Sequence, residues 1–567
     1  MLLGGLSDDA IDRIRHALPQ GFATVVSTFV EAEALLPADI ASKAPITWGR
    51  DCIGVGLLTA LRDRSWIRFD DAAPTTTYIA PISDHLVVCE AGDALSEVIA
   101  ANYAFSLGAG LQIIKPIPDE ICEYLQERLY GILDQREQSQ TQVFEEVLDE
   151  LRARIGPVVL PPSGAVTWIS RKLPLGLAHP ERPSTHLFTY PDLGLAIANG
   201  FAAEQNETPG VNVAIVVDPG TTQAAEIRTT AEALAERRLL VRGLMGRSAD
   251  VTTVSEDIDH FPYDLIIFST HCGDASGYRF NYDFDDAEGI ARHLVVDIAV
   301  GIGQPSDNDD DRFALTELIY FRYLDGVDLN DPRKKESLYV GTAIKDFIDL
   351  RGSLESTSKV QIPRVVGSAA MAMSDHNYIV APQSIAANGT PIIFNNACVS
   401  WRELSGRFMF AGARAYVGTI VPVLDAEASE VATRVFRKHY GKPLAHAVWA
   451  AQNEVYGDAA RRPYVVSGVY PQKLRASAQD TPGIVLRRLQ QEGRAWSQRA
   501  NKELASHLAH AAERSRHVAD YYAREVAAWP ASLGGDASAQ TQSPPDRDVP
   551  GVAFESGAAI RRPPSNV

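Results

Sequence analysis

Short apolar runs of strand length alternate with helical patterns through most of the chain after about residue 211. Between the first two runs, for example, Ala224, Ile227 and Leu234 recur at the spacing of one helical face. Strands that are separated by helices of this length predict a parallel sheet with right-handed crossovers. The strand-like runs are 211–217, 239–242, 264–269, 391–395 and 414–420.

Residues 1–205 predict an α/β region of their own. His85–Glu90 is strand-like, Asp93–Leu107 has the pattern of a helix, and Leu111–Pro116 is strand-like again, which together predict one βαβ unit. No glycine-rich nucleotide fingerprint follows these strands. The sequence therefore assigns this region a fold class but no activity, and we expect it to sense, regulate or recruit.

A polar, turn-rich patch at 204–210 predicts a boundary, after which a second α/β domain occupies 206–475. This domain holds a long insertion at about 280–385. The charged runs of the insertion, 307–311 and 331–336, favour solvated loops, or alternatively a substrate-recognition or regulatory element beside the site. Two of its segments, Thr316–Leu324 and Val340–Leu350, have patterns that we interpret as helical.

The end of the chain differs in composition from the rest. Residues 476–530 form a charged stretch with helical periodicity, which we expect to be exposed helices that could serve as an interaction surface. Residues 531–567 are rich in Pro, Ser, Ala and Gly, a composition typical of disorder. The expected fold class is thus α/β, with a parallel sheet covered by helices on both faces, an N-terminal α/β region and a C-terminal helical stretch.

Composition narrows the classes of function. The net charge of −19 argues against a protein that contacts nucleic acid, which normally shows a basic footprint. The five cysteines are scattered without metal-ligand spacing, so we expect free thiols in a reducing compartment, and neither a metal nor another cofactor. No leader pattern and no apolar run of about 18 residues occurs, so we expect a cytoplasmic protein without a membrane span.

Two strand ends carry the candidate chemistry. The run 264–269 is followed by His271 and Gly273, and the run 391–395 is followed by Cys398 at a turn into a helix. In open parallel sheets, sites gather beyond the carboxyl ends of the strands. A cysteine next to a helix N-terminus and a histidine at a neighbouring strand end are the components of a thiol nucleophile with its acid–base partner.

These residues stand in an order that resembles the CHAT family of caspase-like cysteine peptidases, to which caspases, separases and gingipains are more distantly similar. The resemblance covers about 210–460: strand–His–x–Gly, strand–Asn–Ala–Cys, a helix and a strand, Gly418–Ala428, and Gly441–Ala447 with a final Gln452. It implies a caspase-like sandwich in which His271 is the general acid/base and Cys398 the nucleophile. It also implies that the backbone N–H groups of Gly273 and Cys398 form the oxyanion hole.

The sequence departs from the family pattern at Cys272, which separates the histidine from the glycine and puts the Gly273 donor in question; the N–H of Cys272 is the alternative donor. Two further residues have two readings each. Asp425 is either a helix N-terminal carboxylate or, as separase-like relatives imply, an S1 carboxylate that binds a basic P1 residue. Trp401 is either a wall of the substrate pocket or a core aromatic residue.

The resemblance therefore implies a cysteine endopeptidase that hydrolyses protein substrates through a Cys–His dyad, and an effector role in a bacterial stress or defence system. A regulatory protein partner could bind the N-terminal region or the C-terminal helices. The alternative is a catalytically inactive caspase-like scaffold, in which Cys398 is a buried structural cysteine and His271 a turn histidine. The sequence shows no GxSxG elbow or phosphate loop that would favour another class of hydrolase or transferase.

Overall fold

The structure is a computed structural model. It describes residues 2–3, 24–35, 40, 42–134, 137–189, 193–205, 212–303, 314–330, 334, 337–382, 384–457, 459–474 and 481–529. The predicted boundary patch, the acidic run at 307–311 and the tail at 531–567 fall largely or wholly outside these residues.

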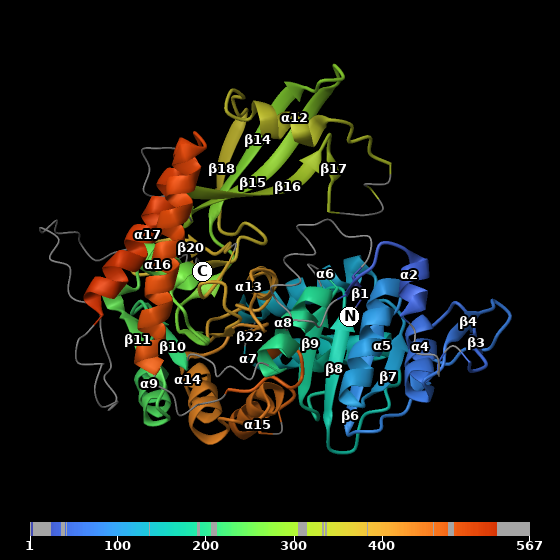
Figure 1. The fold of residues 1–567 in the computed structure, drawn as a ribbon. Coiled ribbons are helices and arrows are strands. Elements are labelled where there is room, and N and C mark those ends of the chain that lie inside the picture. The colour runs from blue at the N-terminus through green and yellow to red at the C-terminus, as the bar shows by residue number, and fades with distance from the viewer. Residues whose placement is uncertain are drawn as a thin grey trace, which may run out of the picture.

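One large sheet forms the centre of the molecule (Figure 1). Its eleven strands lie in the order β11-β10-β12-β21-β22-β23-β9-β8-β6-β7-β5. In that order the strands are β11 (Leu240–Met245), β10 (Val213–Asp218), β12 (Leu265–Phe268), β21 (Ile392–Asn395), β22 (Ala415–Thr419), β23 (Tyr464–Gly468), β9 (Ser184–Phe188), β8 (Ala165–Ser170), β6 (His85–Glu90), β7 (Gly110–Ile114) and β5 (Tyr78–Ile79).

The sheet has two halves that run in opposite directions. We call residues 42–205 the N-terminal half and residues 212–474 the C-terminal half. Strands β11 to β22 are parallel to one another, β23 is antiparallel to β22, and β9 then continues parallel to β23. The carboxyl ends of the parallel strands therefore lie at opposite edges of the sheet in the two halves.

The two halves repeat one strand order. In the C-terminal half, β11-β10-β12-β21 places the strands in the order second, first, third, fourth along the chain. In the N-terminal half, β7-β6-β8-β9 follows the same order, and these strands are also parallel. The predicted division near residue 205 stays a prediction, but the regions on either side of it share a single sheet through β9 and β23.

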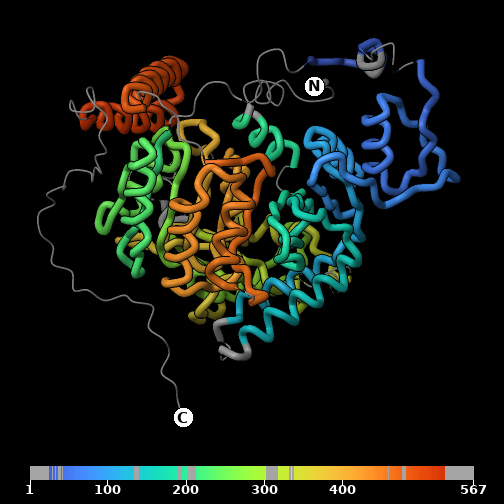
Figure 2. Tube along the Cα trace, turned by 90° about the horizontal axis from the view of Figure 1, so that it is seen from below, coloured from blue at the N-terminus to red at the C-terminus, as the bar shows by residue number. Residues whose placement is uncertain are grey.

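Helices cover both faces of the sheet, so the expected α/β fold class, a mostly parallel sheet with helices on both faces, is confirmed. Figure 2 shows the helices that lie side by side below the C-terminal half; they are α9 (Ala225–Glu236), α14 (Asp425–Thr433) and α15 (Leu444–Tyr456). The opposite face carries α10 (Val251–His260), α13 (Leu404–Phe410), α6 (Asp119–Tyr130) and α7 (Glu137–Ile155). The second face of the N-terminal half carries α4 (Ile53–Asp63), α5 (Ala94–Leu107) and α8 (Leu193–Gln205).

The strands divide the core by their two-residue period. Val213, Ile215 and Val217 of β10 enter the core that α10 and α13 cover, whereas Ala214 and Val216 enter the core above α9, α14 and α15. The first of these cores extends under both halves of the sheet and includes residues of α6 and α7. The two halves are therefore joined by apolar packing as well as by strand pairing.

The insertion forms a second, largely antiparallel sheet that stands above the central one (Figure 1). Its elements are β13 (Cys272–Gly273), β14 (Gly277–Asp285), β15 (Ala291–Gly303), β16 (Ala314–Leu324), β17 (Val327–Asp328), α12 (Ala343–Leu350), β18 (Ser358–Ile362), β19 (Ala370–Ala372) and β20 (Asn377–Ile379). The predicted helix at 340–350 is confirmed by α12.

The predicted helix at Thr316–Leu324 is wrong, because this segment is strand β16, paired along its length with β15. Its apolar side chains alternate between two sides: Ile319 and Phe321 pack with α12, whereas Leu318 and Tyr320 pack on the other face. This period of two is the strand pattern, and it is obscured in the sequence because both faces of the strand are apolar.

The predicted C-terminal helices are confirmed as a hairpin of α16 (Thr481–Ala505) and α17 (Ala509–Ala528) (Figure 1), and α17 packs against α10. Arg242 of β11 pairs with Asp257 of α10 at 2.7 Å and with Glu525 of α17, and the Tyr521 hydroxyl donates to Asp257 at 2.8 Å.

Among the described residues, no helix combines the length and apolarity that crossing a bilayer requires. The remaining small elements are β1 (Leu2–Leu3), β2 (Thr24–Val25), α2 (Phe29–Ala34), β3 (Ile46–Trp48) and β4 (Ile67–Phe69).

Candidate active site

His271 and Cys398 occupy equivalent positions at the ends of neighbouring strands. β12 and β21 are parallel and adjacent, and their last paired residues are Phe268 and Asn395. His271 and Cys398 each lie three residues beyond this pair. Since neighbouring strands are about 4.8 Å apart, the register delivers the imidazole and the thiol to one place at the edge of the sheet.

Both residues line the same small cleft. The cleft lies where the strand order reverses between β10 and β12, the position at which open α/β sheets form crevices. The loops after β10, β12, β21 and β22 all contribute to it. Its lining residues are Thr222, Gln223, Ala224, Glu226, Ser269, Thr270, His271, Asn396, Cys398, Val423, Asp425 and Ala428.

Hydrogen bonds fix the turn that carries Cys398. The side-chain oxygen of Asn395 accepts from the N–H of Ala397 at 3.2 Å, and the Ser400 hydroxyl donates to the Asn395 carbonyl at 3.0 Å. Thr419 of the next strand donates its N–H to Ser400 at 3.1 Å and its hydroxyl to the Ala397 carbonyl at 2.7 Å. Small polar residues around the cysteine thus tie the turn to both β21 and β22.

The residue after the cysteine has an unusual backbone conformation. Val399 has a φ of 48°, in the left-handed region that is sterically costly for a β-branched residue. The surrounding contacts hold it there, because the Tyr416 hydroxyl donates to the Ser400 carbonyl at 2.6 Å directly after it. Backbone strain of this kind clusters at functional sites, where the surrounding structure over-determines it.

The thiol of Cys398 contacts the backbone of Val423. It donates to the Val423 carbonyl at 3.3 Å and accepts from the Val423 N–H at 3.4 Å. Burial raises the pKa of this thiol, and the negative charges of Asp425 and Glu427 add to the rise. Among the residues that the structure describes, no hydrogen bond joins Cys398 to His271, whose side chain is exposed at the rim.

The chain turns away from the cleft directly after His271. Cys272 and Gly273 form β13, which pairs with Met371 and Ala370 of β19. The structure therefore places Gly273, the predicted oxyanion donor, outside the lining of the cleft. Cys272 is also outside it, and its pKa is raised, chiefly by burial against the core.

Trp401 is placed in the core and away from the cleft. Its side chain is buried, its indole N–H donates to the Ser467 hydroxyl at 3.0 Å, and its ring lies 5.2 Å from that of Phe188. This environment matches the interpretation of Trp401 as a core aromatic residue and not as a wall of the substrate pocket.

Asp425 lies at the rim of the cleft as the first residue of α14, where its carboxylate accepts from the Gln223 N–H at 3.1 Å. A second carboxylate, Glu226, was missed by the sequence analysis and lies deeper. Glu226 is 2% exposed, and one of its oxygens accepts from the Ser269 hydroxyl at 2.6 Å and from the Asn396 amide at 3.0 Å. The only sequence signal is its place in the first turn of the helix after β10.

The second oxygen of Glu226 is buried without a hydrogen-bond partner. Such a carboxylate oxygen is costly to bury unless a donor or a cation meets it. Arg461, which lies near the thiol, does not fill this role because it pairs with Glu427 at 2.7 Å. The cleft therefore offers two carboxylates, one at its base and one at its rim, to a positively charged group.

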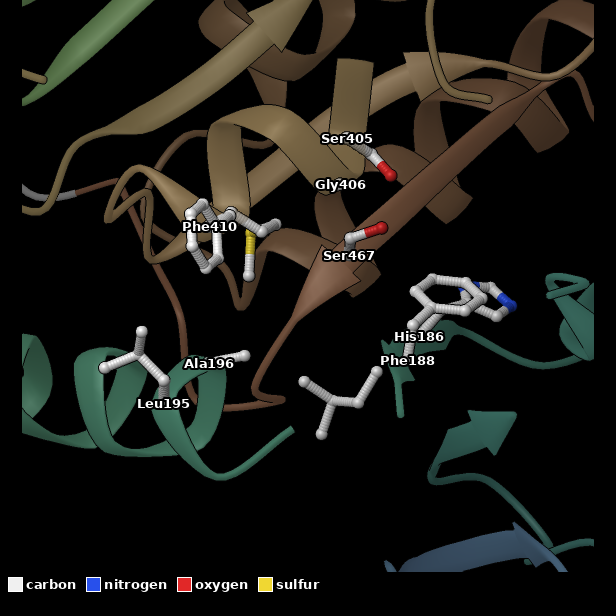
Figure 3. Close-up of a pocket in the computed structure, with 10 residues that line it drawn as sticks. His186, Phe188, Leu195, Ala196, Ser405, Gly406, Phe410 and Ser467 are labelled. Atoms are coloured by element: carbon white, nitrogen blue, oxygen red, sulfur yellow. The ribbon is translucent and has the colours of Figure 1, made fainter. Parts of the chain in front are cut away.

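A second small cavity lies between the two halves of the molecule, lined by residues of β9, α8, α13 and β23 (Figure 3). Its lining is mainly apolar, with Leu187, Phe188 and Met409. Its titratable group, His186, has both ring nitrogens engaged, with the Val466 carbonyl and the Gly176 N–H. Because both nitrogens of His186 are engaged, this ring is not available as a base to Ser405 or Ser467, the two serines that line the cavity.

Comparisons with known proteins add little. No protein-family profile matches the sequence, and no curated protein does. Among solved structures, the chain is similar to a complex of Porphyromonas gingivalis RgpB pro- and mature domains, with 8% sequence identity and a TM-score of 0.35. The match covers 69% of this chain and 80% of that one. A likeness of this degree carries no argument about function, which rests below on the cleft itself.

Proposed function

We propose that this protein is a cysteine endopeptidase of the CHAT type, with Cys398 as the nucleophile and His271 as the general acid/base. The observation that carries the proposal is the register of β12 and β21, after which both residues line one cleft. The strained, hydrogen-bonded turn around Cys398 supports it, since nucleophiles need a fixed position.

The neutral state of the thiol sets the order of the proton transfers. His271 takes the thiol proton as sulfur attacks the peptide carbonyl, because burial makes a free thiolate unfavourable at Cys398. The tetrahedral intermediate then collapses as His271 gives that proton to the leaving amine, which leaves an acyl-enzyme. Water, deprotonated by His271, releases the acid and restores the thiol.

The attack requires the thiol to leave the Val423 backbone groups that it contacts. A substrate strand laid along the cleft would compete for these groups. For the oxyanion, the backbone N–H of Cys398 is the donor that the site retains, because Gly273 lies outside the cleft lining.

We further infer a preference for Arg or Lys at P1. Asp425 at the rim and Glu226 at the base supply two carboxylates, and the unpartnered oxygen of Glu226 can accept from a guanidinium or ammonium group. A negatively charged P1 residue would meet like charge in the same place.

The test is hydrolysis of fluorogenic peptides with Arg, Lys or Asp at P1, together with labelling by an Arg-P1 electrophilic probe. We expect the wild-type chain to cleave the basic substrates, and Cys398→Ala to lose both cleavage and labelling. Cys272→Ala is the matched control, since it removes the neighbouring thiol and keeps the dyad. Labelling that persists in Cys398→Ala, or that disappears in Cys272→Ala alone, would reject the assignment.

A catalytically inactive scaffold is the second candidate. The bonding of the Cys398 thiol to Val423 and the turn of Gly273 away from the cleft favour it. Complete absence of peptide cleavage and of probe labelling in the wild-type chain would select this reading. In either case the N-terminal half and the C-terminal hairpin are the surfaces proposed for a regulatory partner, and an effector role in bacterial stress or defence is the expected setting.

A further inference from the structure

The N-terminal half reaches the candidate active site through the last turn of α6. Tyr130 at the end of this helix accepts a hydrogen bond from the backbone N–H of Asp274 at 3.0 Å. Its hydroxyl also lies against Gly273, where an added Cβ would approach it to 3.3 Å. Asp274 lies three residues after His271, so the contact fixes the segment that leaves the histidine.

Glu127, one turn earlier on the same helix, ties together two further segments. Its carboxylate receives two hydrogen bonds from Arg364, at 2.7 and 3.2 Å, and one from Arg402 at 2.7 Å. Arg402 lies four residues after Cys398, and Arg364 lies at the base of the insertion between β18 and β19. Arg364 also pairs with Asp274 at 2.8 Å and lies over the Tyr130 ring, 3.6 Å from its centre.

The network is arranged as a clamp. Glu127 holds the segment after Cys398 through Arg402, and it holds the segment after His271 through Arg364 and Asp274. Burial raises the pKa of Glu127, but the hydrogen bonds from Arg364 and Arg402 outweigh it, so that this pKa lies below its usual value. The carboxylate is therefore ionised at neutral pH, and charge-assisted bonds of this kind are the stronger ones.

We propose that Glu127 and Tyr130 are positioning residues for the Cys398–His271 dyad, so that the N-terminal half completes an active site whose reacting groups all belong to the other half. Neither residue lines the cleft, so their effect is transmitted through Asp274, Arg364 and Arg402. The inference rests on the proposed peptidase function for its kinetic consequence. Its mechanical consequence, the fixing of two loops, is independent of that function.

The test compares Glu127→Gln and Tyr130→Phe with Glu123→Gln in the full-length chain. Glu123 is the matched control because it lies one turn earlier on α6 and pairs at 2.7 Å with Lys172 of its own half. With an Arg-P1 peptide, we expect kcat of Glu127→Gln to fall about tenfold to a hundredfold with KM within about twofold, since a small displacement of reacting groups slows the chemical step. Tyr130→Phe loses one hydrogen bond and should fall less, and Glu123→Gln should match the wild type.

Hydrogen–deuterium exchange on the same proteins separates this inference from the peptidase assignment. We expect faster exchange at 271–275 and 396–402 in Glu127→Gln and Tyr130→Phe, but not in Glu123→Gln. Unchanged exchange with unchanged kcat would overturn the inference and leave the peptidase intact. Faster exchange in a chain whose wild type cleaves no peptide would remove the peptidase and keep the clamp. A drop in thermal stability without faster local exchange or lower kcat would reduce both residues to a structural role.

Discussion

In the proposed function, Glu226 is the residue through which the cleft would select a basic P1 side chain. A buried carboxylate with one unpartnered oxygen destabilises the free protein, and a cationic P1 side chain would relieve that cost. Stability and activity should therefore respond in opposite directions when the charge is removed while the shape is kept.

We expect Glu226→Gln to unfold at the same or a higher temperature than the wild type, and to lose at least about tenfold in kcat/KM for Arg-P1 peptides, because a buried charge pair with the substrate is lost. Glu232→Gln is the control, since Glu232 lies on the same helix and pairs with Arg437 at the surface. Peptide kinetics with thermal denaturation decide the matter. A variant that is destabilised and fully active would show that the carboxylate is structural.

The state of the Cys398 thiol gives a second prediction for single residues. Burial raises its pKa and the Asp425 charge raises it further, so the thiolate forms only above the pH at which an ordinary cysteine ionises. Iodoacetamide labelling of Cys398 in the free protein should accordingly rise with a midpoint above about 8.5, the usual value.

Removing a neighbouring negative charge favours the thiolate, so Asp425→Asn should shift this labelling curve to lower pH. Glu430→Gln, on the outer side of the same helix and paired with Arg434, should leave the curve in place. The measurement is mass-spectrometric quantification of the Cys398 peptide across a pH series. A shift in the opposite direction would mean that Asp425 does not act on the thiol.

At the scale of elements, alternating apolar runs were enough to locate the strands that carry the site. β10, β12, β21 and β22 fall where the sequence predicts them, and so do the positions of His271 and Cys398 at two strand ends. A buried strand is a short run of apolar residues, so these elements can be found in the sequence without knowing which strands pair.

The features that the sequence did not predict depend on pairing between distant segments. The sequence of β16 predicts a helix, because both faces of this strand are apolar and the alternation of a strand is hidden. Only its pairing with β15 identifies it as a strand. Gly273 was expected to face the oxyanion, but its pairing with Ala370, almost a hundred residues later, takes it out of the cleft. Glu226 and Glu127 were missed for the same reason, since each gains its role from partners brought together only by the fold.

For the whole molecule, the repeated strand order makes the asymmetry between the halves informative. In the N-terminal half the strand order reverses between β6 and β8, where Glu90 at the end of β6 accepts from the N–H groups of Ile117 at 2.6 Å and Arg171 at 2.8 Å. No cysteine or histidine occupies the positions just beyond β8 and β9. Of the two copies of this strand order, the C-terminal one therefore carries the candidate Cys–His pair.

The two halves are joined through the shared sheet. Without β9, the backbone groups of β23 that pair with it would be exposed as a sheet edge. The apolar core that both halves share would also lose the residues of the N-terminal half. Two further hydrogen bonds join the halves: Trp449 donates to the Pro180 carbonyl at 2.9 Å, and Gln472 donates to the Gly200 carbonyl at 2.8 Å. Both would be lost if the N-terminal half were removed.

We therefore expect a fragment of residues 206–530, expressed alone, to aggregate, because it exposes apolar surface and unpaired strand groups together. Co-expression with residues 1–205 should recover a soluble one-to-one complex. A full-length chain cleaved at a protease site inserted between residues 205 and 212 should stay associated. Size-exclusion chromatography and thermal denaturation provide the measurement. A monomeric 206–530 fragment that unfolds cooperatively and cleaves Arg-P1 peptides at the wild-type rate would show that the C-terminal half is self-sufficient, since neither the shared core nor the clamp through Glu127 would then be required.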